Sequence, residues 1–156
     1  MPQEIERKFL VRSDDYKQAA YRQTHIIQGY IAGGAHSTVR VRLRDEKGYL
    51  TIKGKTPKGS FSRYEWEKEI TAEEARELLA LCEGGYIDKT RYEVKVGDFV
   101  FEVDEFYGDN LGLVVAEVEL QSEDDVFDKP DWLGKEVTGQ KQYYNASLIR
   151  KPYRSW

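Results

Sequence analysis

The sequence predicts an α+β protein that is mainly β, with charged side chains on one face of its strands and apolar side chains on the other. In the segment Glu4-Ile5-Glu6-Arg7-Lys8-Phe9-Leu10, three charged residues (Glu4, Glu6 and Lys8) lie two residues apart. A β-strand sends alternate side chains to opposite faces, so these three share one face. The same spacing recurs at Arg40, Arg42 and Arg44; Lys53 and Lys55; Glu65, Glu67 and Glu69; Lys89 and Arg91; Glu102 and Asp104; and Glu117 and Glu119.

The signs of these charges are sorted by strand, and the alternating positions are largely apolar or aromatic. Burying such charges is costly unless they are paired or bind an ion. The pattern therefore indicates a charged interior, as in a barrel that holds a polyanion and its metal ions.

Strands account for most of the chain. Alternation and turn residues predict strands over residues 4–11, 24–31, 37–44, 49–55, 62–70, 86–96, 99–106 and 113–121. Two hairpin turns are legible, Asp45-Glu46-Lys47-Gly48 and Gly97-Asp98.

Helices are expected at four places where a capping residue precedes a suitable segment. Thr71-Ala72-Glu73-Glu74 is a capping box, and its helix is expected to run to about Cys82 before Gly84-Gly85. The other three helices are expected over residues 16–20, after Ser122, and over about residues 141–149.

Composition limits the functional classes. The 156 residues suffice for one domain with a core, and a net charge of −4 lacks the basic excess of a nucleic-acid binder. Cys82 is the single cysteine and there are two histidines, which argues against a disulfide framework or a zinc site. With no signal sequence or membrane-length apolar run legible, we expect a cytoplasmic protein without membrane partners.

An ordered set of motifs resembles the CYTH superfamily, the triphosphate tunnel metalloenzymes, and most of all its short bacterial members that hydrolyse inorganic triphosphate. Residues 4–10 match the family's ExExK signature. The further matches are Gln28-Gly29-Tyr30, Val39-Arg40-Val41-Arg42, Thr51-Ile52-Lys53, Arg63-Tyr64-Glu65-Trp66-Glu67, Lys89-Thr90-Arg91-Tyr92, Phe101-Glu102-Val103-Asp104-Glu105-Phe106, Ala116-Glu117-Val118-Glu119-Leu120 and Tyr143-Tyr144-Asn145. The resemblance implies a closed eight-stranded antiparallel barrel with helices packed outside, as one domain over residues 1–156.

Two positions depart from the family pattern. Gln142 stands where many relatives carry an Arg before the Tyr-Asn pair, and Gln cannot replace Arg on phosphate. Gly29 follows Gln28, where relatives that act on larger organic triphosphates often carry an Asp. The glycine therefore favours a small substrate.

The candidate site residues fall into three groups by chemistry. Basic side chains can neutralise and grip phosphate oxygens, and the substrate-binding candidates are Lys8, Arg40, Arg42, Lys53, Lys89 and Arg91. Carboxylates suit Mg²⁺ or Mn²⁺, and the metal candidates are Glu4, Glu6, Glu117 and Glu119, with Glu65, Glu67 and Asp104 as either ligands or ion-pair partners. The catalytic candidates are Lys8, Tyr30 and Glu6, although Lys8 pairing with a neighbouring Glu and Tyr30 packing remain open alternatives.

The predicted function is divalent-metal-dependent hydrolysis of inorganic triphosphate to pyrophosphate and phosphate. Three alternatives stay open: a class IV adenylate cyclase, a hydrolase of thiamine or nucleoside triphosphate, and a non-catalytic polyphosphate- or nucleotide-binding module. The expected partner is a small polyphosphate, and the chain could be a monomer or a homodimer.

Overall fold

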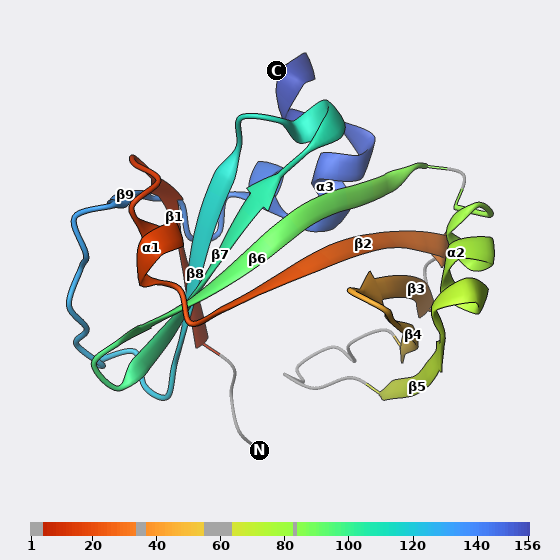
Figure 1. The fold of residues 1–156 in the computed structure, drawn as a ribbon, viewed down its shortest axis with the longest axis horizontal. Helices are drawn as coiled ribbons and strands as arrows, with labels where there is room; N and C mark the ends of the chain where they lie inside the picture. The colour runs from red at the N-terminus through yellow and green to blue at the C-terminus, as the bar shows by residue number, and fades with distance from the viewer. Residues whose placement is uncertain (1–4, 34–36, 55–63, 83) are drawn as a thin grey trace. The chain divides into compact units, whose positions relative to one another are not determined.

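A computed structural model of the protein describes residues 5–33, 37–54, 64–82 and 84–156. Within these ranges the chain forms one antiparallel sheet with a few short helices (Figure 1). The strands are β1 (Ile5–Val11), β2 (Arg22–Gly33), β3 (Ser37–Arg44), β4 (Lys47–Gly54), β5 (Glu65–Thr71), β6 (Tyr86–Val96), β7 (Phe99–Phe106), β8 (Val114–Leu120) and β9 (Leu133–Glu136). The helices are α1 (Tyr16–Ala19), α2 (Ala72–Leu79) and α3 (Asn145–Arg150), with 3₁₀ turns η1 (Gly108–Asn110), η2 (Lys141–Tyr143) and η3 (Tyr153–Ser155). No helix in these ranges has the length and apolar character needed to cross a bilayer.

In the part of the chain that the structure describes, the sheet has nine strands in the order β5-β4-β3-β2-β6-β7-β8-β1-β9, so the prediction of eight was wrong. The additional strand, β9, is four residues long and contains Gly134, too short for its alternation to be legible. Over the described residues β5 and β9 are the edges, and no pairing joins them to close a barrel. Every residue of β5 except Ile70 is exposed, and the charged side chains of this strand are typical of an edge that resists pairing with other chains.

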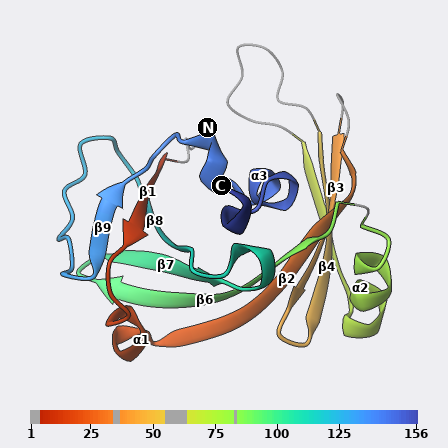
Figure 2. The same cartoon turned by 90° about the horizontal axis from the view of Figure 1, so that it is seen from above.

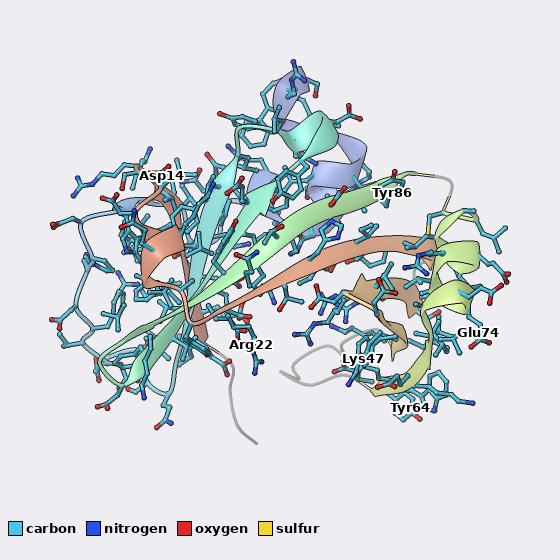
Figure 3. All side chains as sticks on the ribbon, in the orientation of Figure 1. Asp14, Arg22, Lys47, Tyr64, Glu74 and Tyr86 are labelled. Carbon is cyan, nitrogen blue, oxygen red and sulfur yellow. The ribbon has the colours of Figure 1, made fainter. Side chains whose placement is uncertain are left out.

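Several local predictions are confirmed. β3–β4 and β6–β7 are hairpins, and the turn residues Asp45 and Gly97 have φ values of 52° and 60°, the left-handed region expected of tight turns. At the start of α2, Thr71 Oγ1 accepts a hydrogen bond from the Glu74 N–H, and the Glu74 carboxylate accepts one from the Thr71 N–H. Figure 3 labels Glu74 on this helix.

Two helix predictions need correction. No helix follows Ser122, because the Asp125 carboxylate accepts hydrogen bonds from the N–H groups of Gln121 and Ser122 and holds a turn there instead. The last helix begins at Asn145, after the separate 3₁₀ turn η2.

The first compact unit, His25–Asp88, contains β3, β4 and β5 with α2 beside them (Figure 2). Its core is Val41, Leu43, Ala75, Leu79 and Cys82. Gly48 permits the close approach of α2, because a Cβ at this position would lie 2.8 Å from both the Ala75 Cβ and the Thr71 carbonyl oxygen. The helix therefore covers the apolar face of these strands and leaves their charged face away from the core.

The second unit joins Pro2–Thr24 to Lys89–Trp156 and contains β1, β7, β8 and β9. Its core is Phe9, Tyr16, Tyr92, Val94, Phe101, Val103, Ala116, Val118, Leu120, Trp132 and Leu133. These residues include the apolar partners of the charged positions read from the sequence, so the predicted alternation is confirmed. The rings of Tyr16 and Phe101 both meet Trp132 edge to face.

Candidate active site

The second unit carries acidic and basic side chains on the face opposite its core. Antiparallel pairing places Glu6 opposite Glu119 and Lys8 opposite Glu117 across β1 and β8. Glu102 of β7 lies opposite Glu117 on its other side. Because residues directly opposite in a ladder have neighbouring side chains, three strands bring their charges to one surface.

The most buried part of this surface is an ion-pair network between β6 and β7. The Lys89 ammonium, which is 0% exposed, donates to Asp104 Oδ2 at 2.9 Å. Arg91 donates through Nε to Asp104 Oδ1 at 2.9 Å and through a terminal nitrogen to Oδ2 at 3.0 Å. Both carboxylate oxygens thus serve cations, a geometry that favours the ion-pair alternative for Asp104 over the metal-ligand alternative.

The pKa values follow from this network. Burial alone would raise the pKa of Asp104, but Lys89 and Arg91 outweigh it and lower the pKa to about 2. Burial would likewise lower the pKa of Arg91, but Asp104, Glu102 and Glu117 outweigh it and raise the pKa. Asp104 and Arg91 are therefore held in their charged forms.

Carboxylates are crowded beside this network. Burial raises the pKa of Glu102, and the neighbouring charges of Asp104, Glu117 and Glu93 add to the effect, while Arg91, 2.9 Å away, opposes it. A cavity of about 570 Å³ opens at this place. It is lined by Tyr21, Glu93, Asp98, Phe99, Val100, Glu102, Glu119, Leu120, Gln121 and Asp125.

The described residues do not include a preformed group of three or more His, Cys, Asp or Glu side chains that could hold a metal ion. Glu4, one of the predicted ligands, lies outside the described residues. Glu6 and Glu119 face each other across two strands, with Glu117 on the same face. Such pairs of carboxylates suit Mg²⁺, which usually takes one or two together with water and substrate phosphates.

Lys8 is fixed by the chain that follows β9. Its backbone N–H donates to Thr138 Oγ1 at 2.9 Å, and its carbonyl accepts from the Val137 N–H at 2.7 Å. Its ammonium lies 5.0 Å from the centre of the Tyr144 ring, within the range of a cation–π contact. On the other face of β1, Arg7 donates two hydrogen bonds to Glu136, at 2.9 and 2.6 Å.

The first unit has a polar face of its own. Arg42 Nε donates to Gln28 Oε1 at 2.8 Å, and Gln28 is only 1% exposed. Arg40 donates to Thr51 Oγ1 at 3.5 Å, and Thr51 donates to Glu67 at 2.8 Å. Among the described residues no partner accepts from the buried Nε of Arg40, so this face retains an unused donor for an anion.

The remaining candidates of the first unit lie in the same ladder. Tyr30 is opposite Arg40, and Lys53 is opposite Glu65. The first unit therefore holds the candidates Tyr30, Arg40, Arg42, Lys53, Glu65 and Glu67, and the second holds Glu6, Lys8, Lys89, Arg91, Asp104, Glu117 and Glu119.

Four supporting residues lie in the matched motifs but were not predicted to be site residues: Gln28, Thr51, Tyr144 and Asn145. The first two share strand parity with charged positions, so alternation could have found them. Asn145 accepts a hydrogen bond from the Lys89 ammonium at 3.4 Å, and a contact between a helix and a distant strand leaves no trace in local spacing.

Gly29 has a packing role. A Cβ on this residue would lie 2.8 Å from the Cys82 Sγ and 3.2 Å from the Gly85 carbonyl oxygen. Gln28 lies on the polar face of the strand, so a side chain at the next position, Gly29, would point to the apolar face. The glycine is therefore explained by close packing near the end of α2, whatever the substrate.

Together, the fold and these surfaces define a class of mainly β proteins whose single antiparallel sheet is apolar on one face and charged on the other. Residues 2–153 match the CYTH domain. The chain belongs to the CYTH domain family.

The chain is similar to named members over nearly its whole length. An inorganic triphosphatase of Acetivibrio thermocellus is 48% identical over 161 residues, which cover 100% of this chain and 99% of that protein. An inorganic triphosphatase of Nitrosomonas europaea is 36% identical over 149 residues, covering 93% and 95%. The crystal structure of the inorganic triphosphatase NE1496 superposes with a TM-score of 0.74 at 33% identity, covering 96% of each chain.

Proposed function

We propose that this chain is an enzyme that hydrolyses inorganic triphosphate to pyrophosphate and phosphate with the help of a divalent cation. The observation that carries the proposal is the 48% identity, end to end, with a protein named inorganic triphosphatase. The geometry supports it, because buried or partly buried cations on several strands suit a linear anion with several charges.

Substrate binding is assigned to Lys8, Arg40, Arg42, Lys53, Lys89 and Arg91. Arg42 and Arg91 each have a neighbour that fixes the guanidinium, Gln28 for the first and Asp104 for the second. A guanidinium held in place loses less side-chain entropy when it binds phosphate, so these contacts preorganise the site. Lys8 and Tyr30 belong to the proposal as groups that touch the reacting phosphate.

The cation is assigned to Glu6, Glu117 and Glu119, together with Glu4. Their oxygen donors fit Mg²⁺ or Mn²⁺, the two ions expected for carboxylate and phosphate ligands. When bound, such an ion would neutralise phosphate oxygens and lower the pKa of a coordinated water. Glu65 and Glu67 contribute by holding basic or hydroxyl side chains, as Glu67 holds Thr51.

We also propose that residues 1–156 act as one domain. The supporting observation is that the CYTH domain match spans residues 2–153 and so includes both compact units. Unfolding followed by far-ultraviolet circular dichroism and by tryptophan fluorescence would give one coincident transition. Two separated transitions would contradict the single domain.

A phosphate-release assay tests the activity. The purified chain is incubated with inorganic triphosphate, ATP, thiamine triphosphate or pyrophosphate, each with Mg²⁺ or Mn²⁺, and cyclic AMP is measured in parallel. We expect triphosphate to be cleaved well ahead of the others. Cyclic AMP formed from ATP without triphosphate hydrolysis would identify a cyclase. Faster cleavage of an organic triphosphate would make that compound the substrate. Tight binding of triphosphate without turnover would identify a binding module.

A further inference from the structure

Two adjacent residues near the C-terminus contact two lysines that come from different strands. The Tyr144 ring lies over the Lys8 ammonium at 5.0 Å, and the Asn145 side-chain oxygen accepts from the Lys89 ammonium at 3.4 Å. Lys8 is on β1 and Lys89 is on β6, and β7 and β8 lie between these strands in the sheet. The Tyr144-Asn145 pair therefore spans the charged face of the second unit.

The segment that carries this pair is attached on both sides of it. Before the pair, Val137 and Thr138 hydrogen-bond the backbone of Lys8. After it, Leu148 is fully buried, and the Tyr153 N–H donates to the Asn110 side chain at 2.8 Å. Attachment at both ends fixes where the ring and the amide lie.

Aromatic rings on both sides of the pair contact one another. Trp156 meets both Tyr143 and Tyr153 edge to face, with ring centres 5.4 and 5.1 Å away, and its indole N–H donates to the Lys151 carbonyl at 3.1 Å. These contacts lie within the segment itself, so it keeps its shape around Tyr144 and Asn145.

Both partners are uncharged, as is the Phe106 ring, whose centre lies 5.6 Å from the Lys89 ammonium. A ring face and an amide oxygen attract an ammonium through a quadrupole and a dipole, and neither carries a net charge. Asp104, by contrast, offsets the charge that it binds. A neutral partner can thus direct an ammonium without offsetting its charge, and at Lys89 this contact adds to the ion pair with Asp104.

We propose that Tyr144 and Asn145 are positioning residues that set the placement of the Lys8 and Lys89 ammonium groups for the phosphates of the substrate. The inference deepens the proposed function and rests on it for the identity of the anion. The C-terminal segment thereby takes part in substrate affinity, although its Gln142 lacks the charge of the Arg found in many relatives.

Matched variants of Tyr144 test the first contact. Tyr144→Phe keeps the ring, whereas Tyr144→Leu removes it and keeps an apolar side chain of moderate size. Binding of inorganic triphosphate is measured by calorimetry in EDTA, and KM and kcat are measured with Mg²⁺. Tyr144→Phe is expected to match the wild type, and Tyr144→Leu to bind about two- to fivefold more weakly with KM raised more than kcat is lowered. Equal binding by all three proteins, or equal loss in both variants, would overturn the role of the ring.

Variants of Asn145 provide an independent arm. Asn145→Ala removes the acceptor, whereas Asn145→Asp places a second carboxylate beside Lys89. If the neutrality of the partner matters, Asn145→Asp weakens triphosphate binding more than Asn145→Ala does. The opposite order would show that charge pairing, and not neutral positioning, is what Lys89 needs.

A chemical readout separates this inference from the proposed function. Acetic anhydride labels lysine amines, and mass spectrometry compares the rate at Lys8 with that at Lys47, an exposed amine at the start of β4 (Figure 3). We expect the Lys8 rate relative to Lys47 to rise in Tyr144→Leu and to stay unchanged in Tyr144→Phe. If that holds while the wild type hydrolyses no triphosphate, the proposed function fails and the positioning stands. If the wild type hydrolyses triphosphate but neither the labelling nor the affinity changes in Tyr144→Leu, the positioning alone is overturned.

Discussion

Asp104 Oδ2 lies 2.9 Å from the Lys89 ammonium, and the two side chains are 11% and 0% exposed. The same carboxylate takes two hydrogen bonds from Arg91. One buried anion thus serves two cations of β6. Removing the charge of Asp104 should therefore lower the stability of the fold.

Asp104→Asn is expected to destabilise the protein by about 3–5 kcal/mol, because it leaves buried cations without their counter-charge. Urea unfolding at pH 7 measures the free energy of unfolding. Asp128→Asn, at an exposed position, is the matched control and should change it by less than about 0.5 kcal/mol. Equal stability of the two variants would show that Lys89 and Arg91 do not depend on this carboxylate.

The stability contributed by Glu136 depends on pH. Hydrogen bonds from Arg7 and then Thr138 lower its pKa from 4.5 to about 2 despite partial burial. A carboxylate with a lowered pKa in the folded state stabilises it above the unfolded pKa, and this contribution is lost as the pH falls from about 4.5 toward 2. The pair is partly exposed, so solvent limits the effect to about 1 kcal/mol or less.

Thermal unfolding of the wild type and of Glu136→Gln at several pH values measures this effect. The wild type should be the more stable at pH 7, and the difference should vanish near pH 2. A difference that is independent of pH would assign the stabilisation to packing instead of charge.

Gly29→Ala is expected to destabilise the protein by about 1–3 kcal/mol, since its Cβ would crowd the Cys82 sulfur. Gly54→Ala, on β4 of the first unit, is the matched control, because its Cβ would lie 3.6 Å from Tyr64, an ordinary contact. Adding Cys82→Ala should recover part of the loss, as read from a double-mutant cycle by urea unfolding. A cycle with no coupling would place the crowding elsewhere.

Glu6→Gln and Glu117→Gln are expected to lower the rate of triphosphate hydrolysis by about 100-fold or more, equivalent to roughly 3 kcal/mol, while leaving the circular dichroism spectrum unchanged. A neutral amide is a poorer ligand for Mg²⁺ and does not offset its charge. Glu123→Gln, in an exposed turn, is the control. Near-normal turnover of either variant at saturating Mg²⁺ would remove that residue from the metal site.

Arg42→Ala is expected to weaken triphosphate hydrolysis, measured as kcat/KM, by about 1.5–3 kcal/mol, the range for hydrogen bonds to a charged group. Arg42→Lys should recover little of this, because an ammonium cannot contact Gln28 and two phosphate oxygens in the planar manner of a guanidinium. Full activity of Arg42→Lys would show that only charge is needed there.

Alternation in the sequence predicted which side chains share a face. The register places Lys8 opposite Glu117 and Arg91 opposite Asp104, which agrees with charged side chains sharing one face. This part could be read from the sequence because strand parity is a local property. The same holds for the capping box at Thr71.

Contacts between distant segments could not be read in this way. β9 pairs with β1 over only a few residues. The hydrogen bond from the Lys89 ammonium to Asn145 depends on where the final helix packs. Geometry alone favours the ion-pair alternative for Asp104, since its strand position allows a metal ligand and an ion-pair partner equally. The expected helix after Ser122 was wrong because the Asp125 side chain competes for the same backbone donors.

The two compact units differ in how they are distributed along the chain. His25–Asp88 is continuous, whereas the second unit pairs Ile5 with Leu120 and joins Lys8 to Thr138. During synthesis the ribosome releases the N-terminal residues first, so the continuous unit can fold on emergence while β1 waits for β8. A chain made only as far as β7 therefore carries a first strand without its β8 partner, and its exposed edge is open to chaperones and proteases. The contact between Tyr144 and Lys8 forms later still, because it needs residues beyond β9.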